Sequence, residues 1–399
     1  MRRPRISFVT RVVLSPNILI LALYIVIGVL VMPHLCGNLS LSFYYNPPRD
    51  IYDRILAANE ERAEAASELL SNNNFSNLFV RLDQKSPEFC IVIVSIKRPK
   101  PTRYLTQVVA RLVPQISNDQ TVTFTVFNAD GANHSEAVNL ARTIPVVSNP
   151  DTTKDKDYDK QRRDFNYDKQ RRDFIFCFKW CLQRKAAFTV VLEDDALPPQ
   201  DFMKRLRFVL DYRMPKRSKV WAFLKLFYPE KFQGWAQDSN IVAELVGCSL
   251  FGGILLTALS ACVFSTSYAP RLSRHLSITF RLAMSITFVV YMLVSFGRPH
   301  WIELRKVDMH LSSVVQAPGC CTPAVLYAST HLRELVDYLS SIQCSPANPV
   351  DIAVDTFVAE RGLQEWLVVP NMVTHIGLVS SFPRKAWKAH REFGLLFDP

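Results

Sequence analysis

Three long apolar runs stand out in the otherwise mixed hydrophobic and polar pattern of this chain. They cover residues 12–32, 245–264 and 276–296, and Arg281 in the last run is the only charged side chain within them. Each run has about the 20 residues that a helix needs to cross the hydrocarbon core of a membrane. The pattern therefore predicts three transmembrane helices.

The basic residues that flank these runs predict their orientation. Four arginines occur in residues 1–11, and Arg271 and Arg274 lie in the loop 265–275. Segments rich in Lys and Arg stay on the cytosolic side of a membrane, so we expect a cytosolic tail at 1–11, a cytosolic loop at 265–275 and a luminal location for the rest. The alternatives are a cleaved signal peptide for the first run and a buried helical hairpin of a soluble domain for the other two.

Two further features agree with a luminal location. Asn-x-Ser sequons, the acceptors of N-glycans, occur at Asn38, Asn74 and Asn133. The chain also has nine cysteines, which predict disulfides or buried thiols in an oxidising compartment. Cys177 and Cys181 have the spacing of half a zinc site on a helix, but no His/Cys cluster completes that site.

The luminal part reads as a stem followed by a domain in two pieces. Residues 33–85 are the predicted stem and include a strongly helical stretch, Ile51–Leu70. From Phe89 onward, apolar strands alternate with amphipathic helices, which is typical of an α/β fold with a mostly parallel sheet. We expect one such domain, with a first part at 86–235 and a second part at 299–399.

A tandem repeat interrupts this alternation. Residues 158–166 read YDKQRRDFN and residues 167–175 read YDKQRRDFI. Nine residues turn a helix by roughly two and a half turns, so the two copies would face opposite sides of one helix and make different contacts. We interpret one copy as a recent duplication or a gene-model artefact that lengthens a helix, the alternative being a functional insertion.

The stretch FTVVLEDD at residues 188–195 carries the strongest chemical signal, because an apolar strand ends in three carboxylates. Clustered like charges raise one another's pKa unless a cation neutralises them. Carboxylate oxygens suit Mn²⁺ or Mg²⁺, and a diphosphate completes the shell of such an ion. Ligands of parallel sheets bind beyond the carboxyl ends of the strands, so we predict a sugar-nucleotide site here rather than a solvated acidic loop.

This triplet resembles the DxD-type motif of GT-A glycosyltransferases in its EDD variant. Other segments extend the resemblance: WAFLKLFYPEKFQGW at 221–235, CCTPAVLY at 320–327, PVDIAVDTF at 349–357 and PNMVTHIGLVSS at 370–381. Together they are similar to the Golgi GPI-N-acetylgalactosamine transferase family, that of post-GPI attachment to proteins factor 4. The PVD and HIGxxSS elements are also similar to N-acetylglucosaminyltransferase IV.

The resemblance implies a GT-A type, Rossmann-like luminal domain that a transmembrane hairpin interrupts, in a protein of the Golgi membrane. The implied reaction is an inverting, Mn²⁺- or Mg²⁺-dependent transfer of N-acetylgalactosamine from UDP-GalNAc to the first mannose of the GPI glycan, with GPI-anchored proteins as acceptors. A luminal enzyme like N-acetylglucosaminyltransferase IV, acting on N-glycans, and a non-enzymatic membrane tether are the alternatives. Although the net charge is +11, the compartment excludes nucleic acid as a partner.

Within this reading, four residues are expected around the metal ion and the ribose. Asp195 is last in the triplet and is the expected metal ligand. His375, in the sequence THIG, is expected as a second metal ligand or as a diphosphate contact. Glu193 and Asp194 are expected to hold the ribose or to orient the metal's waters.

The remaining candidates are two basic residues and two possible bases. Lys97 and Arg98 follow the first strand of the domain and are expected to meet the donor's phosphates, the alternative being solvated loop charges. An inverting transfer needs a carboxylate base near the acceptor hydroxyl. We expect Asp351 in this role with Asp355, one helical turn later, as the second candidate; a helix cap and a surface charge are the alternative roles.

Overall fold

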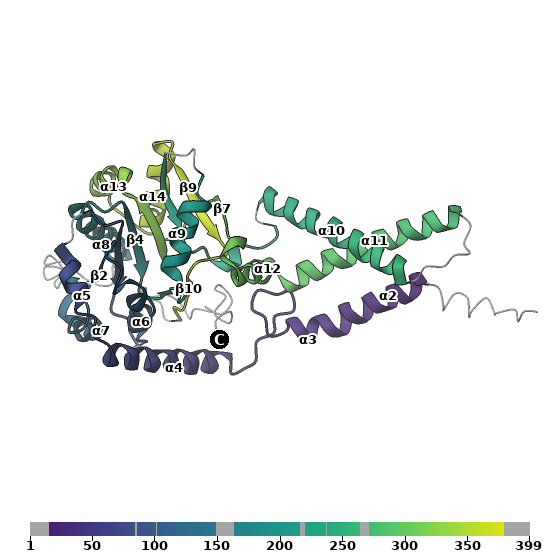
Figure 1. Ribbon diagram of the computed structural model, residues 1–399, viewed down its shortest axis with the longest axis horizontal. Coiled ribbons are helices and arrows are strands. Elements are labelled where there is room, and N and C mark those ends of the chain that lie inside the picture. The colour runs from purple at the N-terminus through teal and green to yellow at the C-terminus, as the bar shows by residue number, and fades with distance from the viewer. Residues whose placement is uncertain are drawn as a thin grey trace, which may run out of the picture. The chain divides into compact units, whose positions relative to one another are not determined.

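The structure is a computed structural model (Figure 1) and describes residues 16–83, 86–100, 102–148, 163–215, 220–236, 238–263 and 271–378. Several sequence expectations fall outside these residues. They are the cytosolic tail, the first residues of the N-terminal span, most of the cytosolic loop, the start of the first repeat copy and the serines of the HIGxxSS element.

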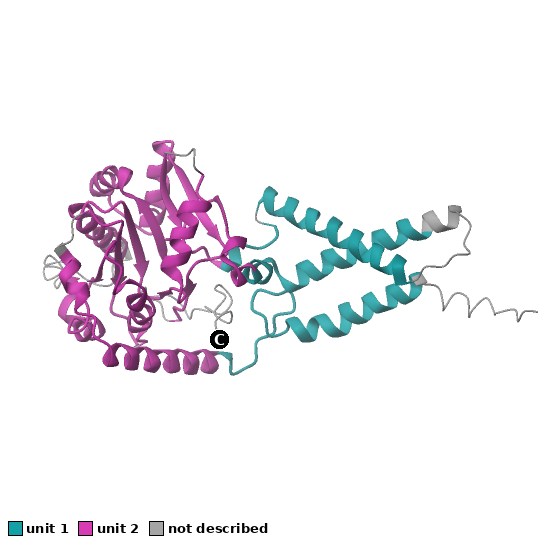
Figure 2. Cartoon of the chain, viewed as in Figure 1, with its two compact units in different colours: residues 1–51, 230–304 teal, residues 52–229, 305–399 magenta. Residues whose placement is uncertain are grey.

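The chain forms two compact units, each assembled from two stretches of sequence (Figure 2). Unit 1 consists of residues 1–51 and 230–304, and unit 2 consists of residues 52–229 and 305–399. Unit 2 therefore begins before the predicted transmembrane hairpin and resumes after it.

An eight-stranded sheet is the centre of unit 2, with the strand order β3-β2-β1-β4-β8-β6-β9-β7. A separate two-stranded ladder pairs β5 with β10. The strands are β1 (Phe89–Ser95), β2 (Val122–Asn128), β3 (Val146–Ser148), β4 (Phe188–Glu193), β5 (Ala196–Leu197), β6 (Trp221–Lys225), β7 (Ser313–Gln316), β8 (Ala324–Ala328), β9 (Gln364–Val369) and β10 (Thr374–His375).

Two groups of helices accompany the sheet. One group consists of α8, α13 and α14, which pack against one another, and in the other α6 packs against α7 and α9. The helices of unit 2 are α4 (Ile51–Asn72, which starts at the last residue of unit 1), α5 (Asn77–Val80), α6 (Tyr104–Ile116), α7 (Ser135–Leu140), α8 (Arg163–Gln183), α9 (Phe202–Tyr212), α13 (Ser329–Ser341) and α14 (Val350–Glu360).

The strands form where the sequence has unbroken apolar runs. β1 pairs in parallel with both β2 and β4, and its residues Phe89–Ile93 are almost completely buried. A parallel strand that is covered on both faces needs apolar side chains at every position rather than at alternate ones. The predicted α/β fold with a mostly parallel sheet is confirmed, since β2 and β3 and also β6 and β9 are parallel neighbours.

Strand β8 connects the two parts of the sequence. It lies between β4 and β6 and is antiparallel to both. Because β4 and β6 precede the apolar hairpin while β8 and β9 follow it, neither part of the sequence contains the complete sheet. The expectation of one α/β domain interrupted by a membrane hairpin agrees with this strand order.

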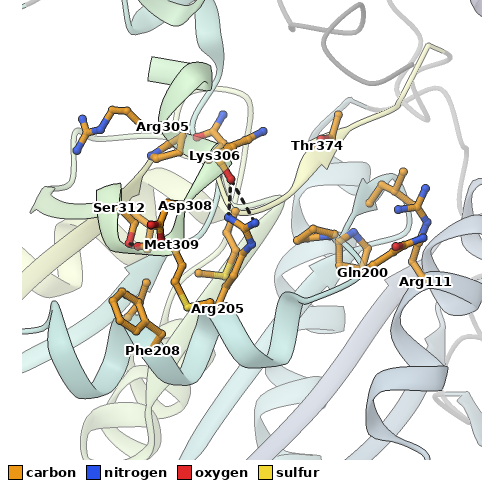
Figure 3. A pocket seen from close by; sticks show the side chains of 18 residues that line it. Arg111, Gln200, Arg205, Phe208, Arg305, Lys306, Asp308, Met309, Ser312 and Thr374 are labelled. Atoms are coloured by element: carbon orange, nitrogen blue, oxygen red, sulfur yellow. Dashed lines mark hydrogen bonds between the residues drawn. The ribbon is translucent and has the colours of Figure 1, made fainter. Parts of the chain in front are cut away.

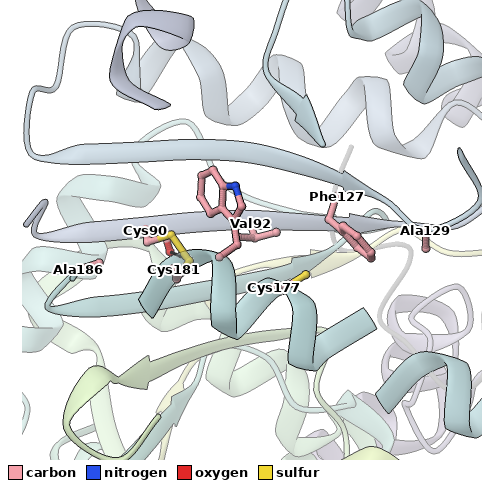
Figure 4. Packing of buried hydrophobic residues seen from close by; sticks show 8 residues of the cluster. Cys90, Val92, Phe127, Ala129, Cys177, Cys181 and Ala186 are labelled. Atoms are coloured by element: carbon pink, nitrogen blue, oxygen red, sulfur yellow. Dashed lines mark hydrogen bonds between the residues drawn. A yellow bond between two sulfur atoms is a disulfide. The ribbon is translucent and has the colours of Figure 1, made fainter. Parts of the chain in front are cut away.

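A disulfide between Cys90 and Cys181 fixes α8 to β1 (Figure 4). Both cysteines are buried in a cluster with Val92 and Phe127. Cys177, one helical turn from Cys181, is a buried free thiol. Since Cys181 is used in the disulfide, the pair does not form half of a zinc site.

Unit 1 contains the three candidate membrane spans. Residues Asn17–Cys36, Ser239–Val263 and Ser277–Phe296 are long and apolar enough to cross a membrane, as the sequence predicts. The corresponding elements are α2 (Pro16–Val26), a π-helical segment (Ile27–Val31), α3 (Met32–Cys36), α10 (Ser239–Val263) and α11 (Arg271–Phe296), followed by α12 (Arg298–Glu303).

Glycines allow α10 and α11 to approach each other closely. A Cβ added to Gly253 would lie 2.4 Å from a side-chain carbon of Ile286 and 3.0 Å from its Cα. One added to Gly252 would lie 3.0 Å from a methyl group of Val289. Small residues at such contacts are how helices associate in a membrane, where lipid removes the hydrophobic driving force.

Polar contacts join the first span to α11. Arg281 Nε donates a hydrogen bond to Asn17 Oδ1 at 2.6 Å. The Tyr291 hydroxyl donates to the carbonyl oxygen of Gly28 at 2.6 Å, within the π-helical segment. These contacts satisfy polar groups that would otherwise be costly in lipid.

The orientation can be tested through the sequons, because Asn38, Asn74 and Asn133 are all exposed. We expect endoglycosidase treatment to lower the apparent mass of the full-length protein on a gel. Replacing the three asparagines with glutamine should abolish that shift, whereas Asn139→Gln, at an exposed asparagine outside any sequon, should preserve it. A wild-type protein with no shift would contradict the luminal orientation.

Candidate active site

Four segments of unit 2 meet at one edge of the sheet. Strands β1, β4 and β6 run in the same direction, so their last residues, Ser95, Glu193 and Lys225, lie at the same edge. Because β8 runs the other way, the loop that precedes it reaches this edge as well. The backbone N–H of Glu193 donates to the carbonyl oxygen of Pro323, in that loop, at 2.7 Å.

Arg98 lies between the two aspartates of the acidic triplet. Its Nη2 donates to Asp194 Oδ1 and, at 2.8 Å, to Asp195 Oδ2. Asp194 Oδ2 also accepts hydrogen bonds from Ser95 Oγ at 2.9 Å and from the Ile96 backbone N–H at 3.2 Å. The end of β1 therefore holds Asp194 in place, and Arg98 provides a cation for both aspartates.

Burial and nearby charges shift the pKa values of Glu193 and Asp195 in opposite directions. Burial, followed by the charge of Asp195, raises the pKa of Glu193 to about 8; Asp194 and Asp351 add to this rise and Arg98 opposes it. Burial would also raise the pKa of Asp195, but Arg98, His375 and a backbone hydrogen bond together outweigh it, and the pKa falls below its usual value. Three clustered carboxylates need a cation to neutralise them, and Arg98 is such a cation.

His375 reaches the same carboxylate from β10. Its Nε2 lies 3.5 Å from Asp195 Oδ2, and the Ile376 backbone N–H donates to the Asp195 carbonyl oxygen at 2.9 Å. Burial lowers the pKa of His375, and the nearby aspartate only partly offsets this. Gly377 makes this approach possible, because a Cβ there would lie 2.2 Å from Asp195 Oδ2.

The geometry fits a divalent cation held by few protein ligands. Asp195 Oδ1 is buried and accepts no hydrogen bond from the part of the chain that the structure describes. A neutral imidazole, that of His375, lies beside the same carboxylate. Mg²⁺-type ions in nucleotide-dependent enzymes commonly use only one or two side chains, since substrate phosphates and water fill the other positions.

The two candidate bases lie beside an unusual pair of cysteines. Cys320 and Cys321 are joined to each other by a disulfide in the loop before β8. The backbone N–H of Cys321 donates to Asp351 Oδ2 at 3.0 Å, and that of Cys320 donates to Asp355 Oδ2 at 2.7 Å. Potential ligand atoms of both cysteines and Asp351 lie within 4.8 Å of one another, but the disulfide occupies both sulfur atoms.

Lys225 distinguishes the two aspartates. This completely buried side chain donates to the carbonyl oxygens of Pro318 and Cys320, both at 2.8 Å, and to Asp355 Oδ1 at 3.3 Å. Asp355 therefore neutralises a buried ammonium group, whereas Asp351 forms no ion pair with the described residues. Protonation of Asp355 would break its ion pair with a buried ammonium group, so of the two candidates Asp351 is better placed to accept a proton.

A cavity of about 550 Å³ opens beside Asp194. Basic residues from the segment after β1 line it, and these include both predicted phosphate contacts. They are Lys97, Arg98, Lys100 and Arg103. His134 and Glu136, from the segment after β2, form another part of the wall. A cationic cavity at the end of β1 that touches the acidic triplet has the position and charge to bind a nucleoside diphosphate.

Helix α4, in the predicted stem, forms part of this cavity. Ser67, Leu70 and Ser71 line it. Nearer the start of α4, Asn59 Nδ2 donates to the Thr102 carbonyl oxygen at 3.1 Å, and Asn59 Oδ1 accepts from Gln107 Nε2 at 3.0 Å. Helix α4 thus holds the segment that carries Arg98, in addition to any role as a spacer.

The sequence reasoning missed several residues at this site. Ser95 Oγ has one proton, which it donates to Asp194, so at 2.7 Å the Nε2–H of His134 must donate to Ser95. The Tyr104 ring lies 5.1 Å from the Arg98 guanidinium carbon, and its hydroxyl accepts from the Leu378 N–H at 2.8 Å. As the last residue of β1, Ser95 is detectable from the strand-end rule; His134 and Tyr104 have no comparable signal.

Comparison with a known family agrees with this geometry. The family described as GPI-N-acetylgalactosamine transferase PGAP4 matches residues 89–374. The match begins with β1 and ends in β10, so it includes both parts of the sheet, the acidic triplet, the two candidate bases and the apolar hairpin between them. Because the match covers well over half of the sequence, this chain belongs to the GPI-N-acetylgalactosamine transferase PGAP4 family of glycosyltransferases.

Proposed function

We propose that this protein transfers N-acetylgalactosamine from UDP-GalNAc to the first mannose of the GPI glycan of GPI-anchored proteins. The transfer inverts the configuration of the sugar and depends on Mn²⁺ or Mg²⁺. The protein acts in the Golgi membrane, with unit 2 in the lumen. The observation that carries the proposal is the cationic cavity that ends on Asp194, at the carboxyl ends of β1 and β4, in a chain of this family.

Donor binding is assigned to the cavity and to the acidic triplet. Lys97 and Lys100 provide positive charge for the diphosphate along the cavity wall, where Arg103 is already paired with Glu60. Arg98 is already paired with Asp194 and Asp195, so it orients the triplet and keeps its charge balanced. A cation held by Asp195 and His375 would neutralise charge that develops on the departing diphosphate.

Asp351 is assigned the role of base. Its Oδ2 is oriented by the Cys321 N–H and its Oδ1 by the Ile352 N–H at 3.0 Å. A fixed carboxylate can accept the proton of the attacking mannose hydroxyl as the new glycosidic bond forms. The nearby Asp355 is committed to Lys225, so we assign it a role in holding the Cys320–Cys321 loop.

The donor and metal assignment is tested on purified protein in detergent with a panel of UDP-sugars. We expect UDP-GalNAc to be used, and added chelator to stop the reaction. Asp195→Ala should lose metal-dependent binding of UDP-GalNAc, because the diphosphate would no longer have a bridging cation. Lys204→Ala, at an exposed residue of α9, is the control. Preference for another UDP-sugar, or full metal-dependent binding by Asp195→Ala, would contradict the assignment.

The base assignment predicts different defects for two neighbouring aspartates. Asp351→Asn keeps the side-chain shape and should retain donor binding, while the transfer rate falls by roughly 10²–10⁴-fold, the usual contribution of general base catalysis. Asp355→Asn should lower thermal stability because it leaves buried Lys225 without its counter-charge. If Asp351→Asn transfers normally and a folded Asp355→Asn does not, the base has been assigned one helical turn too early.

The role of α4 predicts that its exposed Ser71 controls donor affinity. Ser71→Trp fills part of the cavity, so the KM for UDP-GalNAc should rise by about tenfold or more, which corresponds to about 1.4 kcal/mol. Glu68→Trp places the same side chain on an exposed position of α4 outside the cavity and should leave that KM unchanged. Equal donor KM values for the two variants would show that α4 only tethers unit 2.

A further inference from the structure

A second cavity, of about 260 Å³, lies next to the active site in unit 2 (Figure 3). Leu197 pairs with Thr374, and both line this cavity. Ala196 pairs with His375 in the same ladder. Because side chains alternate between the two faces of a strand, the cavity and the His375–Asp195 contact lie on opposite sides of the β5–β10 ladder.

The lining of this cavity combines an apolar floor with a basic rim. The floor suits the carbon–hydrogen face of a sugar ring, and its residues include Leu197, Phe208, Val209, Val368, Pro370 and Met372. The basic residues are Arg111, Arg205, Arg305 and Lys306, and Asp308 is the only acidic residue among the described residues of the lining. Such a combination recognises an anionic group attached to a carbohydrate.

The charges of the rim are only partly compensated. Arg205 Nε donates to Asp201 at 2.7 Å, and its other nitrogens reach the Lys306 carbonyl oxygen at 3.3 Å. Asp308 Oδ1 accepts the backbone N–H of His310 at 2.9 Å. The half-buried Arg111, which lines this cavity, has no side-chain hydrogen bond or ion pair with the described residues, so its positive charge has no protein counter-charge there.

We propose that this cavity is an acceptor subsite that binds a phosphodiester of the glycan being modified. The inference rests on the proposed function, and it goes further by naming the recognised group. A glycosylphosphatidylinositol contains a phosphodiester, which carries one negative charge at every physiological pH. The donor's diphosphate is assigned to the cavity beside Asp194, so an anion bound in this second cavity, which has a different lining, belongs to the acceptor.

The experiment compares two water-soluble acceptor glycans that differ only in the presence of the phosphodiester. Wild-type protein should use the phosphodiester form with a kcat/KM about tenfold higher or more, the effect of one charge-assisted contact. In Arg111→Gln and in Lys306→Gln this ratio should fall toward one. Lys204→Gln, at an exposed residue of the same helix as Arg205, should keep the wild-type ratio.

The outcomes separate this inference from the proposed function. If wild-type protein transfers N-acetylgalactosamine but the ratio is the same in Arg111→Gln and wild type, the subsite is wrong and the proposed function stands. A defect that appears only in vesicles containing phosphatidylinositol, and not with soluble acceptors, assigns the cavity to a lipid headgroup and also overturns the inference.

A direct binding measurement covers the remaining case, in which wild-type protein transfers no N-acetylgalactosamine and the proposed function fails. The soluble phosphodiester-bearing acceptor glycan is then titrated calorimetrically into wild-type protein, Arg111→Gln and Lys204→Gln. Binding that is lost only in Arg111→Gln supports an anion site in the cavity. Equal binding, or no binding by wild-type protein, overturns it. Thermal melting of each variant shows whether it is folded.

Discussion

The pairing of β8 with β4 and β6 is the interaction on which unit 2 depends. β8 comes from the second part of the sequence and closes a sheet whose neighbouring strands come from the first. Its antiparallel direction brings the Cys320–Cys321 loop to the end of β4, where Pro323 accepts the backbone N–H of Glu193. The acidic triplet lies in the first part of the sequence and the candidate bases lie in the second. Without this pairing the two would not be held close together.

Charge balance is the second constraint. Arg98 forms ion pairs with the buried Asp194 and Asp195, and Asp355 forms one with the buried Lys225. A buried ion is tolerated only when it is paired and its remaining hydrogen bonds are satisfied. Each pair joins segments that are far apart in the sequence, so the same contacts that stabilise the sheet edge also position its chemistry.

The family assignment and the geometry give complementary information. The family identifies a glycosyltransferase that modifies GPI-anchored proteins, and hence an enzyme that works at a membrane. The three apolar spans of unit 1 agree with that setting. The structure adds two separate cavities, one beside Asp194 and one lined by Arg111, and a transferase needs separate places for a donor and an acceptor.

The apolar spans, the parallel strands and the acidic end of β4 could be predicted from the sequence, because each depends on a local pattern of side chains. The partners of these residues could not. Arg98 lies 96 positions from Asp194, and Asp355 lies 130 positions from Lys225, so no local periodicity connects them. The tertiary structure alone decides that a helix of the predicted stem lines the cavity beside Asp194, that Lys225 pairs with Asp355 and not with Asp351, and that Arg111 lines a second cavity. Those roles depend on how elements that are distant in the sequence pack together. Burial and charge pairing fix that packing only when the whole sheet has formed.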